Sequence, residues 1–156
     1  MNRWISYTAS ALLAAVVIAN CDRTISARLP EGTPVVISNI APVDLQKDPF
    51  TIIDPMIEDA QLNMTVVSGG GCRDHIYTLT MTPAAFMESF PVQANIFLWH
   101  DGMDDPCDAI VTDSVSFDLT PILELYTQMY GHTGQVNLNL YNFEQTESTR
   151  LVLKTN

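Results

Sequence analysis

The feature that most constrains this chain is an alternation of apolar and polar residues with a period of two. From Phe50 onward, short runs place an apolar side chain at every second position, with mostly polar residues between. Such a run puts one face of a β-strand on a core and the other toward solvent. The clearest runs cover residues 60–66, 76–81, 92–99, 114–119, 136–141 and 150–154.

Helical patterns are few. Thr120 stands where a helix cap is expected, Pro121 follows in the first turn, and Gly131 is expected to end the helix. One further helical turn is expected within residues 83–89. Many short strands and one or two short helices predict an all-β fold, an antiparallel immunoglobulin-like β-sandwich formed by residues 50–156.

The N-terminal residues predict an export signal rather than a part of the fold. The stretch from Ala9 to Ala19 carries no charge and is shorter than the roughly 20 apolar residues that span a bilayer. It leads into Cys21 and resembles the signal of bacterial lipoproteins, with Asn20 departing from the usual small residue. The resemblance implies removal of the signal peptide, residues 1–20, and lipid on the Cys21 sulfur. The alternative is ordinary signal-peptidase cleavage after Ala19.

This signal predicts a membrane-anchored lipoprotein of the bacterial cell envelope, with inner or outer membrane left open. Residues 21–49 are expected to form the lipid anchor and a tether. The formal net charge is −11, from 7 basic and 18 acidic residues. Nucleic acid is therefore excluded as a partner, because phosphate binding needs a basic face. The expected partners are the membrane, through the lipid anchor, and another envelope protein.

The chain has three cysteines. If Cys21 carries lipid, Cys72 and Cys107 remain, and an oxidising compartment favours a disulfide between them. Closing a loop of that length should stabilise the fold by roughly 3–4 kcal/mol in the chain-entropy model. Three glycines precede Cys72, but no helix pattern and no Lys-Ser/Thr follows, so a phosphate-binding loop is not indicated.

Two histidines lie beside the cysteines, and the spacing from Cys72 to His75 occurs in zinc and copper sites. A disulfide would remove the thiolates and leave the histidines with a carboxylate as candidate ligands for Zn or Cu. Aspartates crowd the next loop, and Ca prefers several oxygen ligands, although the spacing is not that of an EF-hand. The alternative is that the histidines brace the disulfide and the aspartates form a turn. The candidate metal ligands are His75, His100, Asp101, Asp104 and Asp105.

No catalytic motif indicates an enzyme, since the chain lacks G-x-S-x-G, H-E-x-x-H and a free cysteine paired with histidine. Several short motifs resemble small exported bacterial proteins of unassigned function, and that resemblance implies no activity. They are Gly-Gly-Gly-Cys72-x-x-His75, Phe90-Pro-Val, His100-Asp101, Pro106-Cys107 and Phe117-Asp-Leu-Thr120-Pro. We therefore expect a non-catalytic binding or structural role in the envelope, with no cofactor. The alternatives are a metal-binding lipoprotein that uses His75, His100 and the Asp101–Asp108 loop, and a hydrolase.

Overall fold

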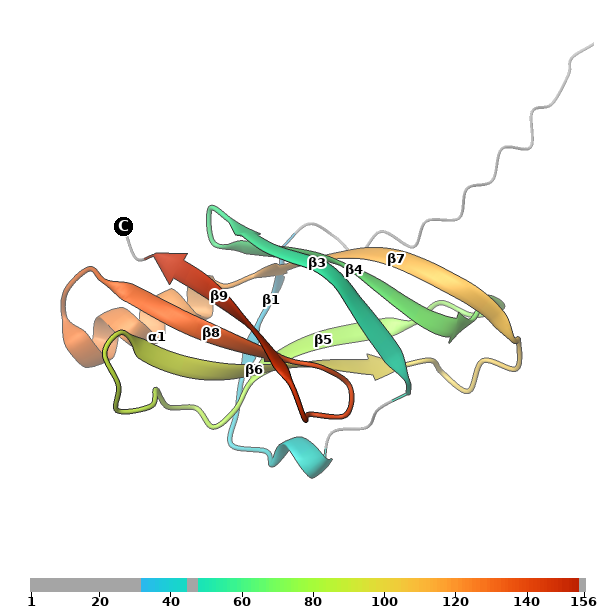
Figure 1. Ribbon diagram of the computed structural model, residues 1–156, viewed down its shortest axis with the longest axis horizontal. Helices are drawn as coiled ribbons and strands as arrows, with labels where there is room; N and C mark the ends of the chain where they lie inside the picture. The colour runs from blue at the N-terminus through green and yellow to red at the C-terminus, as the bar shows by residue number, and fades with distance from the viewer. Residues whose placement is uncertain (1–31, 45–47, 155–156) are drawn as a thin grey trace, which may run out of the picture.

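A computed structural model describes residues 32–44 and 48–154. In these residues, nine strands form two sheets packed face to face, and two helical segments connect strands (Figure 1). Sheet A has the strand order β1-β7-β4-β3, and sheet B the order β2-β5-β6-β8-β9. The strands are β1 (Thr33–Pro34), β2 (Val36–Ile37), β3 (Phe50–Glu58), β4 (Gln61–Gly70), β5 (Ile76–Met81), β6 (Val92–Asp101), β7 (Ala109–Asp118), β8 (Gln135–Tyr141) and β9 (Ser148–Lys154). The helical segments are η1 (Pro42–Asp44) and α1 (Thr120–Tyr130).

The predicted all-β sandwich with a short helix is confirmed, but its pairings are not all antiparallel. Strand β1 runs parallel to β7, β2 to β5, and β6 to β8. The β6–β8 pair is parallel because the chain leaves β6, forms β7 in sheet A and returns to sheet B through α1. A parallel pair needs such a crossover. Alternation along a strand reveals which side faces inward, but it does not reveal the direction of the neighbouring strand.

The core lies between the sheets and is formed by the inward side chains of the alternating runs. Burying one such side chain contributes roughly 1.5–3 kcal/mol. Both sheets supply fully buried residues, which include Leu62, Val66, Leu79, Ile96, Phe117, Leu138 and Leu153. The inward faces of the predicted strands are therefore confirmed.

Helix α1 begins at Thr120 and ends before Gly131, as predicted, and Gly131 adopts a left-handed φ of 66°. The predicted Thr120 cap is not formed. Instead, the Asp118 carboxylate accepts hydrogen bonds from both the N–H and the O–H of Thr120. The buried side chains of Ile122 and Tyr126 fix the helix to the core. The helical turn expected within residues 83–89 is absent, and bends with an isolated bridge stand in its place.

The N-terminal part of the described chain belongs to the sandwich, although the sequence predicts a tether over residues 21–49. Strand β1 joins sheet A and β2 joins sheet B. Val35 lies between them, is buried, and donates its N–H to the carbonyl of Asp118. The folded unit therefore begins no later than Gly32. The predicted signal peptide and Cys21 lie outside the described residues, and no helix in the described part is long and apolar enough to cross a bilayer.

Candidate functional site

A disulfide joins Cys72 to Cys107, as predicted, with the Cα atoms 5.8 Å apart. Cys72 lies in the loop between β4 and β5, and Cys107 in the loop between β6 and β7. Each loop connects one sheet to the other. The bond therefore closes one end of the sandwich, on the right in Figure 1, where β4 and β6 finish.

Asp105 holds both cysteine loops through hydrogen bonds to backbone. Its Oδ2 atom accepts the N–H groups of Gly71, Cys72 and Arg73, each at 2.9 Å, and Oδ1 accepts the N–H of Cys107 at 2.9 Å. Burial by itself would raise the pKa of Asp105. The N–H groups, together with His75, outweigh burial and hold this pKa well below its usual range. Asp105 is therefore an ionised acceptor that ties the disulfide loops together.

The two histidines touch each other in the interior. Nδ1 of His75 lies 3.0 Å from Nε2 of His100, whose own Nδ1 lies 3.2 Å from the carbonyl oxygen of Asp48. His75 turns its Nε2 toward Oδ2 of Asp105, at 3.4 Å. His100 is only 1% exposed, and burial lowers its pKa. The sequence predicted that these histidines lie near the disulfide, and the structure brings them into direct contact.

The hydrogen-bond partners of the histidines constrain which ring nitrogens carry protons. A carbonyl oxygen only accepts, so Nδ1 of His100 must donate to Asp48. Neutral His100 then offers Nε2 as an acceptor, and Nδ1 of His75 donates to it. The carboxylate of Asp105 also only accepts, so the 3.4 Å contact to Nε2 of His75 is a hydrogen bond only when that nitrogen carries a proton. The contacts thus run from Asp48 through His100 and His75 to the Asp105 carboxylate.

A second branch of the cluster crosses from one sheet to the other. Ser68 on β4 places its hydroxyl 3.3 Å from Nδ1 of His75 and 3.4 Å from the hydroxyl of Tyr77. Tyr77 on β5 donates to Asp113 on β7 at 2.8 Å and stacks on His100 with ring centroids 4.8 Å apart. Burial raises the pKa of Tyr77. We call this cluster the histidine network: Asp48, Ser68, His75, Tyr77, His100, Asp105 and Asp113.

Sequence reasoning missed four members of the histidine network, although part of the signal was present. Ser68 continues the inward positions of the β4 run, and Asp113 precedes the inward positions of the β7 run. A polar side chain at an inward position needs a buried partner. Two such residues at the same end of one sheet indicate a polar contact with the facing sheet. The alternation of residues 76–81 places Tyr77 inward together with apolar residues, and no pattern marks Asp48.

The candidate metal ligands lie at this end of the sandwich, but protein contacts already use several of them. The facing nitrogens of His75 and His100 bond each other, and Asp101 accepts a backbone N–H within its own loop. Asp104 is exposed. A zinc, copper or calcium site stays a prediction, and metal binding would have to replace these contacts. In the part of the chain that the structure describes, the potential ligand cluster found is Cys72, Asp105 and Cys107, whose sulfurs form the disulfide.

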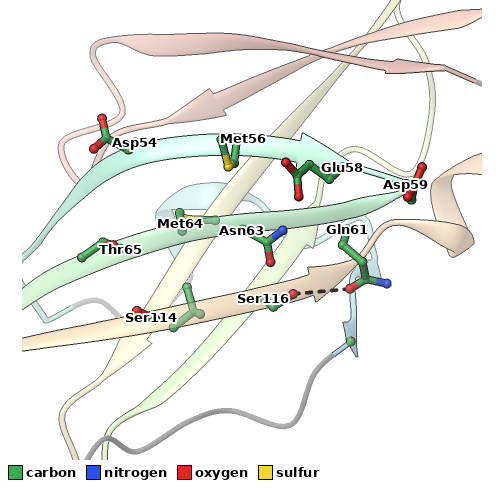
Figure 2. A pocket seen from close by; sticks show the side chains of 12 residues that line it. Asp54, Met56, Glu58, Asp59, Gln61, Asn63, Met64, Thr65, Ser114 and Ser116 are labelled. Carbon is green, nitrogen blue, oxygen red and sulfur yellow. Dashed lines mark hydrogen bonds between the residues drawn. The ribbon is translucent and has the colours of Figure 1, made fainter.

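The outer face of sheet A carries a groove of about 770 Å³, which the sequence did not predict. Figure 2 shows its side chains on three neighbouring strands, with a hydrogen bond between Gln61 and Ser116. The side chains are mostly short and polar. They come from β3 (Asp54, Met56 and Glu58), the following turn (Asp59), β4 (Gln61, Asn63 and Thr65) and β7 (Ser114 and Ser116).

The shape of the groove follows from two irregularities of the β3–β4 hairpin. The register of β3 against β4 shifts between Ile53 and Met56, and Asp54 within this bulge has a φ of 48°. A bulge bends its strand and re-aims side chains. At the hairpin turn, Asp59 and Ala60 both have positive φ, as a two-residue type I′ turn requires. The bulged strand and its turn supply Asp54, Met56, Glu58 and Asp59 to the lining of the groove.

In the histidine network, the Ser68 hydroxyl contacts the His75 imidazole, which in turn contacts the Asp105 carboxylate. A hydrolase needs these three kinds of group in that order. However, Ser68 and His75 are both buried, and Nδ1 of His75 is shared with His100. Neither the groove nor a smaller cavity of about 280 Å³ beside β3 is lined by any of these three residues. The arrangement links the two sheets and gives no support to a catalytic role.

Comparison with known proteins identifies the fold. No family model matches the chain, and no curated protein is similar to it in sequence. A structure from Parabacteroides distasonis, described as toxin-related, has a TM-score of 0.52 and 24% identity over 81% of this chain. A NigD-like immunity protein from Bacteroides caccae has a TM-score of 0.54 and 16% identity over 78% of this chain. Neither is described as an enzyme.

These likenesses concern only part of each structure. The chain spans 61% of the Parabacteroides protein and 59% of the Bacteroides caccae protein. At this level of identity they show a shared fold, and the activities of the whole proteins do not transfer. The chain is therefore similar in fold to bacterial proteins of Bacteroides and Parabacteroides.

Proposed function

We propose that this chain is a lipid-anchored protein of the bacterial cell envelope, and that it binds another envelope protein without catalysis. The observation that carries the proposal is the groove on the outer face of sheet A. Its Met56 and Glu58 side chains stand exposed on an open surface. By contrast, most side chains of the histidine network are buried, and they are hydrogen-bonded to one another. The groove is thus the surface on which binding by another molecule is best supported.

Two further observations support an envelope location. The Cys72–Cys107 disulfide is the state expected of a protein in an oxidising compartment. The sequence before Cys21 resembles a lipoprotein signal. Among structures that share the fold, one is described as an immunity protein and one as toxin-related. Those descriptions belong to the other proteins, and a protein partner for this chain is compatible with them.

The anchor is tested by the mass and location of the protein. Intact mass analysis of the membrane fraction should show acyl groups on a chain that begins at Cys21. The Cys21→Ser variant should leave the membrane, because the lipid is the expected anchor. An unmodified wild-type chain that begins at Asn20 would contradict the lipoprotein assignment.

The binding role is tested by crosslinking in the living cell. A photo-crosslinking residue at Met56, in the groove, should trap one envelope protein. The same residue at Val152 is the matched control, because Val152 is similarly exposed on β9 in sheet B. Equal labelling at both positions, or none at Met56, would contradict binding through this face.

A further inference from the structure

We infer that the groove of sheet A takes an extended, cationic segment of the partner protein. This inference rests on the proposed function and deepens it by naming the chemistry of the occupant. Three features of the groove support it: its negative charge, its exposed Met56 side chain and the strands that form its floor.

The charge of the groove is negative. Asp54, Glu58 and Asp59 lie on its lining and are all exposed. The described part of the chain contains the basic residues Arg73, Arg150 and Lys154, and none of them lines the groove. The whole chain adds to the attraction, since its net charge is −11. Complementary charge guides a partner to such a surface and selects against acidic ones. A cationic occupant is therefore favoured.

The groove is not purely polar. Met56 in its lining is 51% exposed, between Glu58 and the bulge. Methionine adapts to irregular partners. Lysine and arginine carry apolar stems that pack on such side chains while their charged ends reach carboxylates. A polypeptide with these residues matches both parts of the surface, whereas a small hydrated cation matches only the carboxylates.

The floor favours an extended chain. Asn63 pairs with Ser116 and Thr65 with Ser114, so two rows of short side chains cross β4 and β7. Alternate residues along a strand repeat at about 6.6 Å, which is also the repeat of an extended peptide laid on them. Addition of a strand to the free edge of β3 is disfavoured, because the bulge with Pro55 interrupts its hydrogen-bonding groups. Recognition is thus expected through side chains on the face of the sheet.

The test measures binding of a fluorescent peptide of about ten alternating lysine and threonine residues by anisotropy. The protein is the full mature chain with Cys21→Ser, which needs no detergent. The groove variant combines Asp54→Asn, Glu58→Gln and Asp59→Asn. Asparagine suits this design because it tolerates the left-handed φ of positions 54 and 59. The control variant removes the same charge elsewhere, through Asp44→Asn, Asp108→Asn and Glu124→Gln, at exposed positions outside the groove.

We expect the groove variant to bind the peptide about ten-fold more weakly and the control to change by less than about two-fold, because the nearby charges dominate. Equal losses in both variants would show general attraction to an acidic protein and overturn the inference. Absence of saturable peptide binding to the protein with the unmutated groove would also overturn the inference. Thermal unfolding of both variants checks that the fold is retained.

One other occupant is distinguished by the same assay. Gly32 lines the groove, and the sequence just before it contains Arg23 and Arg28. If Arg23→Ser with Arg28→Ser increased peptide affinity about ten-fold, the groove would be occupied by the chain's own tether, and the assignment to a partner would be overturned. Failure of the peptide assay leaves the proposed function standing if the photo-crosslink at Met56 still traps an envelope protein.

Discussion

The histidine network and the groove of sheet A are both rich in polar side chains, but those of the network are mostly buried and those of the groove are open to solvent. In the network, Tyr77 and His100 are buried, and their polar atoms have partners within the chain. In the groove, Glu58 and Met56 are exposed on an open sheet face. Burying a polar group is costly unless it is hydrogen-bonded. A satisfied buried cluster therefore stabilises the fold, whereas the groove keeps its polar side chains open to solvent and is the surface proposed to bind a partner.

The largest expected effect on stability comes from removing the disulfide. The Cys72→Ser, Cys107→Ser double variant should lose roughly 3–4 kcal/mol of unfolding free energy, since the unfolded chain is no longer constrained. Urea unfolding of the oxidised protein and of the variant measures the difference, and the reduced wild-type protein should match the variant. A loss below about 1 kcal/mol would mean that the loops are held by Asp105 and the core without the bond.

The next effect tests whether the network bridges the sheets. Tyr77→Phe removes one hydroxyl and leaves the buried Asp113 carboxylate without that donor. The expected loss is about 1–3 kcal/mol of unfolding free energy. Tyr130→Phe is the matched control, because Tyr130 is exposed at the end of α1, and it should cost less than about 0.5 kcal/mol. Similar small losses in both variants would remove the structural role given to the network.

A smaller, graded effect is expected with pH. Because the pKa of His100 in the folded protein lies below its ordinary value of about 6.5, the unfolded chain binds more protons just below that pH. The contribution of His100 to the stability of the folded protein should therefore fall as the pH drops below about 6.5. Asp105 has a lowered pKa, so its contribution should be lost only further down, below about pH 4.

Urea unfolding between about pH 8 and pH 5 measures the contribution of His100. His100→Gln should flatten the dependence relative to the wild type. His132→Gln is the control, because His132 is exposed and contacts the carbonyl of Thr133 outside the network. A wild-type slope that His100→Gln leaves unchanged would contradict the assignment to His100.

The smallest expected effect distinguishes a structural network from a metal site. A chelator should leave the unfolding temperature unchanged, because the histidine nitrogens already bond each other, Asp48 and Asp105. Metal analysis of protein purified after export is the direct measurement. Stoichiometric zinc, copper or calcium that is lost in the His75→Ala, His100→Ala double variant would replace the structural interpretation with the metal-binding one.

Much of the disulfide end was predictable because its signals are local. Cys72 and Cys107 are the pair that remains if Cys21 carries lipid, and His75 and His100 lie close to these two cysteines in the sequence. The direct contact of the histidines needed the pairing of β5 with β6, which sets Tyr77 opposite His100. The groove was not predictable in the same way. The bulge at Asp54 and the exposed side of β3 depend on how that strand meets β4.

The sequence by itself determined the inward face of most strands and the span of α1, and it favoured the Cys72–Cys107 pairing that the structure shows. These features follow from the side-chain period of a strand, from Pro121 and Gly131, and from the chemistry of thiols in an oxidising compartment. Only the tertiary structure decided three features. They are the parallel strand pairings, the hydrogen bonds that join Ser68 and Asp113 to Tyr77 and His75, and the groove. Each of these depends on contacts between residues far apart in the chain, and strand register and sheet packing set those contacts.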